Sequence, residues 1–194
     1  MATALASAWR APLVASTVSR LLIDLNRSIR HPHLFSAATR DTPAETRAEI
    51  VEDHYRPYRG QVERLVTQAE SRGDRVIHIS SHSFTAQLDG TVRGADVGLF
   101  HHPGRRGETE MWARWKESLA ASAPELRVRR NDPYAGKGDG LTSHLRLRFA
   151  PSDLGIELKI NQGIVVATGR RWRALQRVLI DTLRTARAAG ARHD

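Results

Sequence analysis

The sequence predicts an α/β fold, with one domain over residues 1–194. Short runs dominated by apolar residues have the length of buried strands, and longer segments carry apolar residues at helical spacing. Strands that alternate with helices along a chain are typical of a sheet covered by helices. The strands are expected at residues 76–81, 97–102 and 154–162. The helices are expected at residues 42–55, 107–122 and 169–189, with one more that carries Val62, Leu65, Val66 and Ala69 on one face and runs to Arg72.

Shorter elements are expected around this framework. Residues 1–10 have the composition of an alanine-rich helix, and residues 11–16 have the pattern of a further strand. Residues 42–45 (Thr-Pro-Ala-Glu) match a capping box with proline at the first helical position. Pro57 is expected to end the helix that this box opens. Residues 126–130 alternate between apolar and basic side chains, as a half-exposed strand does.

The chain is organised around residues 76–84, Val-Ile-His-Ile-Ser-Ser-His-Ser-Phe. The strand is predicted to end at Ser80 or Ser81, which leaves His82 just past the end of a central strand. In α/β sheets, the loops that follow central strands converge on ligands. An imidazole there can bind a metal or transfer a proton. The alternative is a histidine that only caps a turn.

Composition excludes several classes of function. The chain has no cysteine, so disulfides, thiolate metal sites and a cysteine nucleophile are excluded, and a metal would need histidine and carboxylate ligands. No apolar run is long enough to cross a bilayer, and the first ten residues lack the basic start and apolar region of a leader. We therefore expect a cytoplasmic protein with no membrane partner.

The strongly basic charge raises the question of nucleic acid. The formal net charge is +9, with 30 lysine and arginine residues. These residues are scattered, almost all are arginine, and no aromatic stacking positions lie between them. A GC-rich genome explains this composition better than polyanion binding, and an anionic small substrate would also suit the charge. We expect no nucleic-acid partner.

Five segments carry motifs in a fixed order: residues 20–27 (RLLIDLNR), 78–84 (HISSHSF), 93–99 (RGADVGL), 129–136 (RRNDPYAG) and 155–162 (GIELKINQ). In this order they resemble the N-formylglutamate amidohydrolase family, which is related to zinc carboxypeptidases and to the aspartoacylase and succinylglutamate desuccinylase group. The similarity extends over nearly the whole chain from about residue 12. It implies a three-layer α/β/α fold with a mixed, mostly parallel central sheet.

The resemblance also implies an activity, namely zinc-dependent hydrolysis of an N-acyl amino acid, typically N-formylglutamate to formate and glutamate. His82 matches a metal-binding histidine of the family. Glu157 matches the carboxylate that acts as general base on water and then protonates the leaving amine. Without the resemblance, Glu157 would be interpreted as a solvent-facing strand residue paired with a neighbouring arginine.

Further residues match the part of the family site that holds the substrate. Asn26 and Arg27 match the pair that grips the substrate carboxylate, and a planar guanidinium suits that task. Arg20 matches the arginine that polarises the scissile carbonyl. Taken alone, Asp24 and Asn26 could merely close a turn, and Arg27 could be a surface charge. The pocket is expected to be lined from the loop of residues 131–140, by Asn131, Tyr134 and Gly136.

One part of the family pattern is missing. The family has an early histidine and acid pair after its first strand, and we expect this sequence to begin after those segments, without the first strand and helix. One histidine cannot hold a catalytic zinc, which needs three protein ligands. Three explanations stay open: a misassigned start, a degenerate homologue that keeps only the substrate grip, or an altered site completed by His78, Asp96 or His101. A missing strand would also leave a sheet edge open for self-association.

Two functions from different classes follow. The first is the zinc-dependent amidohydrolase. The second is a non-catalytic protein that binds acidic amino acids through Asn26 and Arg27 without metal. A nucleic-acid-binding protein ranks last, because no recognised binding motif is present.

Overall fold

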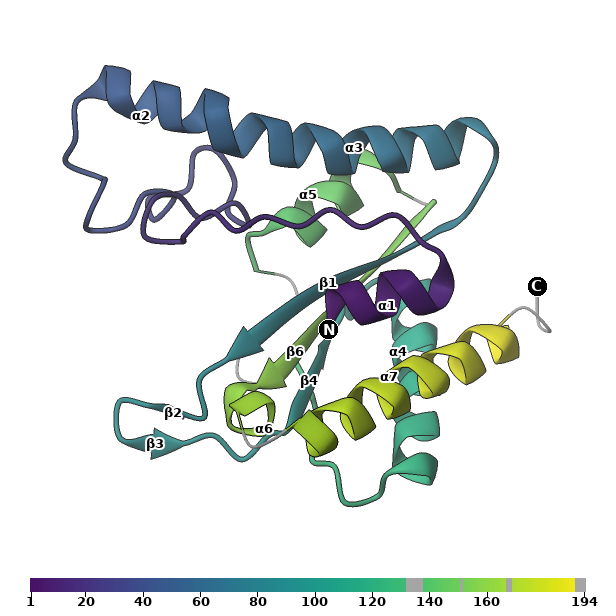
Figure 1. Ribbon diagram of the computed structural model, residues 1–194. Coiled ribbons are helices and arrows are strands. Elements are labelled where there is room, and N and C mark those ends of the chain that lie inside the picture. Colours follow the sequence, from purple (N-terminus) through teal and green to yellow (C-terminus); the bar gives the residue numbers. More distant parts are fainter. Residues whose placement is uncertain (132–137, 151, 167–168, 191–194) are drawn as a thin grey trace. The chain divides into compact units, whose positions relative to one another are not determined.

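The computed structural model describes residues 1–131, 138–150, 152–166 and 169–190. It contains a four-stranded sheet with helices packed against it (Figure 1). The predicted α/β fold with a mixed, mostly parallel sheet is confirmed. Among the described residues, no helix is long and apolar enough to cross a membrane.

The chain divides into two compact units. The sheet unit comprises Met1–Ala11, His78–Lys137 and Gly155–Asp194, and the helical unit comprises Pro12–Ile77 and Gly138–Leu154. Each unit is formed from segments that lie far apart in the sequence. The first residues of two strands belong to the helical unit, and the rest of the sheet belongs to the sheet unit.

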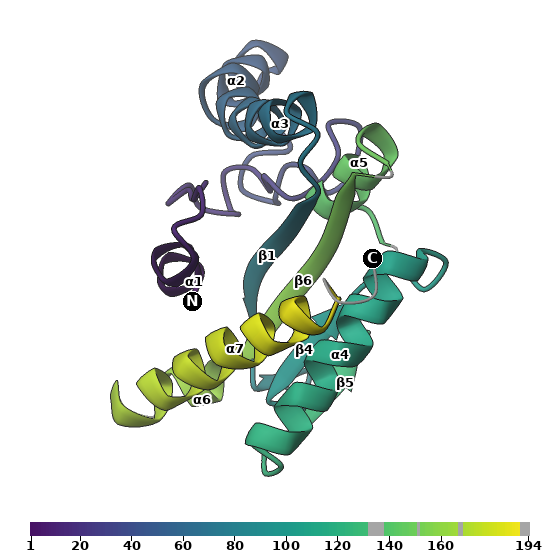
Figure 2. The ribbon, with the colours of Figure 1, turned by 90° about the vertical axis from the view of Figure 1, so that its right-hand side faces the viewer.

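The four strands follow the order β1-β6-β4-β5. Their bounds are Val76–Phe84 for β1, Val97–Phe100 for β4, Val128–Arg130 for β5 and Asp153–Asn161 for β6. Strand β4 pairs parallel with β5 and antiparallel with β6. Strands β1 and β6 begin side by side, because the Val76 amide donates to the Ser152 carbonyl at 2.9 Å, and their arrows run the same way in Figures 1 and 2.

A small hairpin follows β1. It consists of β2 (Gln87–Leu88) and β3 (Thr91–Val92), which pair antiparallel. Asp89 and Gly90 form its turn with φ values of 50° and 77°. Aspartate followed by glycine is a residue pair that adopts such positive φ angles in two-residue hairpin turns. The turn expected at these two residues is confirmed.

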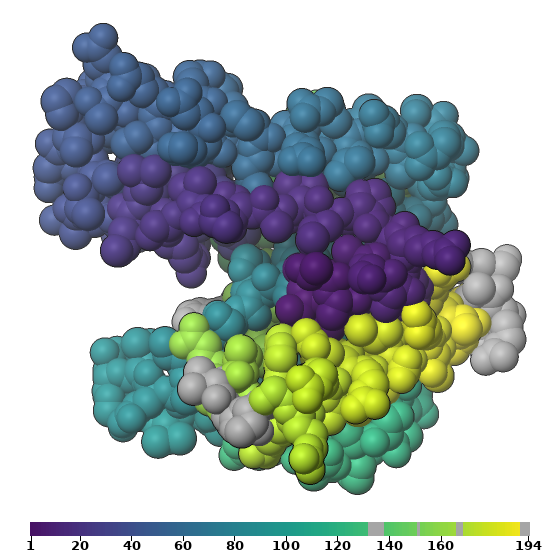
Figure 3. Space-filling model, viewed as in Figure 1, coloured from purple at the N-terminus to yellow at the C-terminus, as the bar shows by residue number. Residues whose placement is uncertain are grey.

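Four helices belong to the sheet unit: α1 (Ala2–Trp9), α4 (Arg106–Ser122), α6 (Gln162–Val166) and α7 (Gly169–Gly190). Helices α4 and α7 pack closely together, and the indole N–H of Trp115 on α4 donates to Thr182 Oγ1 on α7 at 3.1 Å. Helices α1 and α7 are also in contact, as Figure 3 shows. Arg184 on α7 donates to the Ala8 carbonyl in the last turn of α1.

The core of the sheet unit forms between these helices and one face of the sheet. Apolar side chains alternate with polar ones along β6, so one face of the strand is buried. The fully buried side chains of this core include Val97, Leu99, Met111, Trp115, Leu119, Ile156, Leu158 and Leu179. The alternation predicted for Ile156, Leu158 and Ile160 against Glu157 and Lys159 is confirmed.

The helical unit contains α2 (Ala44–Ile50), a π-helical turn (Val51–Tyr55), α3 (Arg56–Ser71) and α5 (Leu141–Arg148). Its two apolar clusters lie around Ile23, Leu34 and Tyr55, and around Val62, Val66, Leu141, Leu145 and Phe149. Helix α5 was not predicted, because its apolar residues are few and follow a glycine-rich loop.

Three predictions about the front of the chain are wrong. Residues 11–16 form no strand, because no strand of the described sheet pairs with them and Pro12 has no N–H to donate. The capping box does not form: Pro43 is the N-cap of α2, and Thr42 Oγ1 donates to the Thr39 carbonyl instead.

The third error concerns Pro57, which does not end a helix. Helix α2 continues through the π-helical turn into α3, as the upper part of Figure 1 shows, and Pro57 lies in the first turn of α3. A proline is tolerated in a first turn because its missing N–H has no required acceptor there. In the π-helical turn directly before it, the backbone hydrogen bonds span five residues instead of four.

Candidate functional site

The segment that contains Asn26 and Arg27 binds the start of α5. The Leu141 amide donates to Asn26 Oδ1 at 3.1 Å, the Ser28 amide donates to Asp139 Oδ2 at 2.9 Å, and Arg27 Nη1 donates to the Asp139 carbonyl at 3.4 Å. We call these three contacts the 26–28 clamp. They join the Asp-Leu-Asn-Arg motif to the end of the loop of residues 131–140, which was expected to line the pocket.

Asn26 caps a helix that has no cap of its own. Gly140 is the N-cap of α5 and has no side chain to accept an N–H, whereas Asn26 Oδ1 accepts the Leu141 amide. A Cβ at position 140 would lie 3.2 Å from Asn26 Nδ2 and 3.4 Å from Oδ1. Glycine therefore allows the asparagine side chain to approach. Among the described residues, no group accepts a hydrogen bond from Asn26 Nδ2, so the amide keeps a donor for a ligand.

Asp24 organises the rest of the motif. It accepts the Asn26 amide through Oδ1 at 3.0 Å and the Arg20 guanidinium through Oδ2 at 2.7 Å, and Arg27 Nε lies 3.7 Å from Oδ2. The Arg20 side chain is 71% exposed. Arg20 is thus paired with Asp24 at the surface of the helical unit, while the Asp24 carboxylate is nearly buried.

His82 lies inside a strand and not beyond its end, which corrects the prediction that the strand stops at Ser80 or Ser81. Strand β1 runs to Phe84, and it is an edge strand of the described sheet, not a central one. The serines at positions 80, 81 and 83 do not end the strand, because an edge strand tolerates polar side chains on both faces. The direction of the half-buried His82 side chain is therefore set by its position in the strand and not by the conformation of a loop.

His82 and Glu157 point to the same face of the sheet. Ile79 packs in the core with Ile156 and Leu158. Because successive side chains of a strand point to opposite faces, His82 on β1 and Glu157 on β6 point away from that core. The two strands are neighbours. His78 shares this face, and its Nε2 lies 3.0 Å from Ser80 Oγ.

Glu157 has one carboxylate oxygen in an ion pair. Lys159 Nζ lies 3.2 Å from Glu157 Oε2, and both side chains are largely buried. The same ammonium lies 4.4 Å from the centre of the Phe100 ring. Among the described residues, no hydrogen bond or ion pair engages Glu157 Oε1. One oxygen is thus held and the other is available.

Asn131 joins the ends of two strands. It has a left-handed backbone (φ 47°), its amide donates to the Leu99 carbonyl at 3.2 Å, and its Oδ1 accepts the His101 amide at 3.0 Å. Asparagine tolerates this conformation better than most residues. Tyr134 and Gly136, which were also expected to line the pocket, lie outside the described residues.

Asp96 and His101, two residues considered for an altered metal site, have structural contacts. Asp96 receives the Arg127 guanidinium at 2.9 and 3.1 Å and the Arg127 amide at 3.0 Å. The side-chain hydrogen bond from Arg127 lowers the pKa of Asp96 below its ordinary value, against the effect of burial. The fully buried His101 ring stacks on Trp112 with centroids 5.1 Å apart.

A catalytic zinc requires three protein ligands, and the described residues do not supply them together. Within either unit, the described histidine, aspartate and glutamate residues form no group of three that could hold a metal ion. His82 and Glu157 share a sheet face, but a third ligand is missing from that set. The residues present therefore do not fit the zinc site that the resemblance implies.

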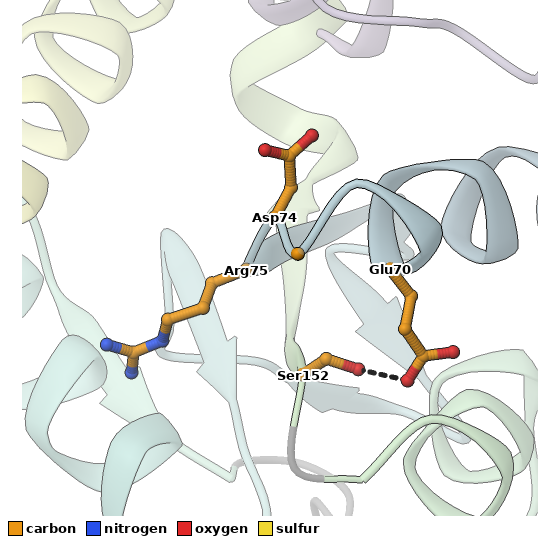
Figure 4. A pocket seen from close by; sticks show the side chains of 5 residues that line it. Glu70, Asp74, Arg75 and Ser152 are labelled. Carbon is orange, nitrogen blue, oxygen red and sulfur yellow. Dashed lines mark hydrogen bonds between the residues drawn. The ribbon is translucent and has the colours of Figure 1, made fainter.

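A pocket of about 500 Å³ lies in the helical unit, at the start of β1 and apart from the predicted site residues (Figure 4). Its lining residues are Glu70, Gly73, Asp74, Arg75 and Ser152. The Ser152 hydroxyl lies 2.8 Å from Glu70 Oε1, and Asp74 pairs with Arg72 at 2.9 Å. Both carboxylates of the pocket are thus engaged, Glu70 by Ser152 and Asp74 by Arg72.

Sequence reasoning missed two features of the helical unit. Asp139 provides both a carboxylate oxygen and a carbonyl to the 26–28 clamp, and only the spacing Asp139-Gly140 before a helix could have signalled it. Arg59 is 5% exposed, and its position one turn after Tyr55 on a helix was the available signal.

The chain was compared with known families and structures. The family model for FGase, N-formylglutamate amidohydrolase, matches residues 1–164. A gene product from Agrobacterium tumefaciens is similar in structure, with a TM-score of 0.81 and 27% sequence identity over 97% of this chain and 75% of that chain. An N-formylglutamate amidohydrolase from Ralstonia eutropha JMP134 shares the fold, with a TM-score of 0.66 and 21% identity over 95% of this chain and 81% of that one. A comparison with curated proteins finds no match.

Proposed function

Because the chain belongs to the N-formylglutamate amidohydrolase family, we propose that it hydrolyses the amide bond of an N-acyl amino acid such as N-formylglutamate. The family match over residues 1–164 is the observation that carries the proposal. The substrate has two chemically different parts, an amide to be cleaved and carboxylates to be bound. The proposed residues divide between these tasks.

Glu157 is the proposed general base. Its Oε1 accepts a proton from the attacking water, and the resulting carboxylic acid returns that proton to the departing amine nitrogen. The ion pair between Lys159 and Oε2 supports this role, because it fixes the orientation of the carboxylate while the second oxygen stays available. His82 on the neighbouring strand points to the same face and is the proposed metal ligand.

Asn26 and Arg27 are the proposed carboxylate-binding residues. The Asn26 Nδ2 donor supports this role because the other end of its amide is fixed by the Leu141 amide, so the donor is held in place before a ligand arrives. Arg20 is proposed to polarise the scissile carbonyl. Asn131, Tyr134 and Gly136 are proposed to line the pocket for the acyl or side-chain end.

Zinc remains a proposal that depends on ligands beyond those the described residues bring together. A zinc ion held by His82 together with two further protein ligands would lower the pKa of a water bound to it. The test is elemental analysis of the purified 194-residue chain. One zinc per chain would support His82 as a ligand, and its loss in His82→Ala would assign it.

The function is tested by formate release from N-formyl-L-glutamate. Glu157→Gln should lower kcat by about 10²-fold or more, because a general base typically contributes that much. Glu125→Gln is the matched control, since Glu125 is exposed and belongs to no predicted site. Wild-type turnover in Glu157→Gln would remove this residue from the base role. Binding of N-formylglutamate without turnover by the wild type would favour the non-catalytic binder.

A further inference from the structure

Arg59 is a buried cation for which the described residues supply no counter-charge. Its side chain belongs to α3, the residue is 5% exposed, and Nη1 is buried with no hydrogen-bond partner. Among the described residues, its guanidinium contacts the Tyr55 ring, 5.5 Å from the centroid, and forms no ion pair. Burying a charged group without hydrogen bonds or a counter-ion is unfavourable, and an arginine cannot become neutral to avoid it.

The carboxylate that could neutralise Arg59 is bound elsewhere. Glu63 lies one turn further along α3, where an ion pair with Arg59 would be possible. Instead, Glu63 Oε1 lies 2.8 Å from His144 Nε2, and Glu63 Oε2 accepts Arg148 Nη1 at 2.7 Å. Both of its oxygens are directed to α5. Within the described part of the chain, Arg59 is therefore left without an ion pair although Glu63 lies one turn away.

Arg59 also lies next to the proposed carboxylate-binding residues. The Tyr55 hydroxyl donates to the Arg27 carbonyl at 2.8 Å, so the ring that Arg59 contacts also touches the 26–28 clamp. Burial raises the pKa of Tyr55, Arg59 opposes this shift, and Asp139 and Glu63 add to it. Arg59 is thus linked to the 26–28 clamp through Tyr55, which it contacts with its guanidinium.

We propose that Arg59 forms a binding site for the carboxylate of an acidic small molecule, within the helical unit and beside the 26–28 clamp. A carboxylate offers two oxygens to the planar guanidinium and supplies a negative charge next to Arg59. The choice of an acidic amino acid derivative as ligand rests on the proposed function. In that case Arg59 selects for a second carboxylate, as N-formylglutamate has.

The test uses the full chain and glutarate, a dicarboxylate with no amide bond to cleave. Calorimetric titration compares the wild type with Arg59→Met, which keeps a long stem and removes the charge. Arg56→Met is the matched control, because Arg56 lies on the same helix and its side chain is 64% exposed. Arg59→Lys keeps the charge without the planar fork, and it decides the question if the methionine variant does not fold.

We expect the wild type and Arg56→Met to bind glutarate alike and Arg59→Met to bind at least about tenfold more weakly, since one charge-assisted contact corresponds to a change of that size. Arg59→Lys should also bind more weakly than the wild type. The unliganded Arg59→Met protein should melt at the same or a higher temperature, because an unpaired buried charge is removed.

Several results would overturn the proposal: no glutarate binding by the wild type, equal binding by the Arg59 variants, or tighter binding of sulfate than of glutarate at equal ionic strength. A lower melting temperature of unliganded Arg59→Met, with unchanged glutarate affinity, would assign Arg59 a structural role. None of these measurements depends on hydrolysis. A chain that fails to cleave N-formylglutamate can still pass this test, and the two failures are distinguishable.

Discussion

Replacing Asn26 with alanine should remove the helix cap of α5. Helix α5 begins at the buried Leu141, and its N-cap Gly140 has no side chain, so Asn26 Oδ1 at 3.1 Å is the acceptor for the Leu141 amide. The first N–H groups of a helix have no partner within it. Loss of an N-cap acceptor destabilises a protein by about 0.5–2 kcal/mol, and an unsatisfied buried amide by about 1–3 kcal/mol.

We therefore expect Asn26→Ala to lose about 1–2 kcal/mol of folding free energy. In a chain of this size, that corresponds to a fall of roughly 2–8 °C in the melting temperature. Asn26→Asp should behave differently, because it keeps an oxygen acceptor and places a negative charge at a helix N-terminus, which is favourable. It should retain most of the stability but lose glutarate binding, since the Nδ2 donor becomes an anionic oxygen.

The assay combines thermal denaturation, hydrogen exchange of the Leu141 amide and glutarate titration. The alanine variant should show faster exchange at Leu141, and the aspartate variant should not. If Asn26→Ala kept the wild-type melting temperature and exchange rate, the capping role would be refuted. Equal destabilisation by both substitutions would show that the oxygen acceptor is not what matters.

Two further predictions concern the sheet unit. The pKa of Asp96 is lowered in the folded protein, so its pair with Arg127 adds stability at pH values above the ordinary pKa of 3.8, and this stability is lost as the pH falls through the lower folded-state pKa. The melting temperature of the wild type should therefore decrease more steeply below pH 4 than that of Asp96→Asn. Parallel melting curves for the two proteins would contradict this. Thr182→Val should destabilise the protein by about 1–3 kcal/mol in urea denaturation, because it leaves the buried Trp115 indole N–H without its acceptor. Thr182→Ser keeps the hydroxyl and should be close to wild type. Equal stability of all three proteins would exclude that hydrogen bond as a contributor.

The large elements of the fold were predictable because their sequence patterns are periodic. Helices α4 and α7 carry apolar residues at helical spacing, and β6 alternates between apolar and polar residues. The elements that the sequence did not predict correctly depend on tertiary packing. Residues 11–16 have the composition of a strand, but a strand also needs a neighbour for its backbone groups, and no local pattern reveals whether one exists.

The residue types of the proposed site come from the sequence, and the structure adds their placement within each unit. Motif order drew attention to His82 and Glu157, and strand alternation then puts both side chains on one face. The 26–28 clamp was not predictable, because Asn26 and Leu141 are 115 positions apart and only the tertiary structure brings them together. The unpaired state of Arg59 depends on where Glu63 points, which sequence spacing alone does not determine.

The Asp-Leu-Asn-Arg motif has structural contacts of its own, apart from the binding role that we propose for it. Asp24 accepts the Asn26 amide and Arg20, Asn26 Oδ1 caps α5, and the Arg27 carbonyl accepts the Tyr55 hydroxyl. The contact made by Asn26 uses Oδ1 and leaves Nδ2 as a donor. Fixed donors lose little freedom on binding, so a segment immobilised by its own fold can bind a carboxylate more tightly than a mobile loop with the same residues. Substitutions in this motif should therefore change stability and binding together unless, as in Asn26→Asp, the group that holds the fold is kept while the donor is removed.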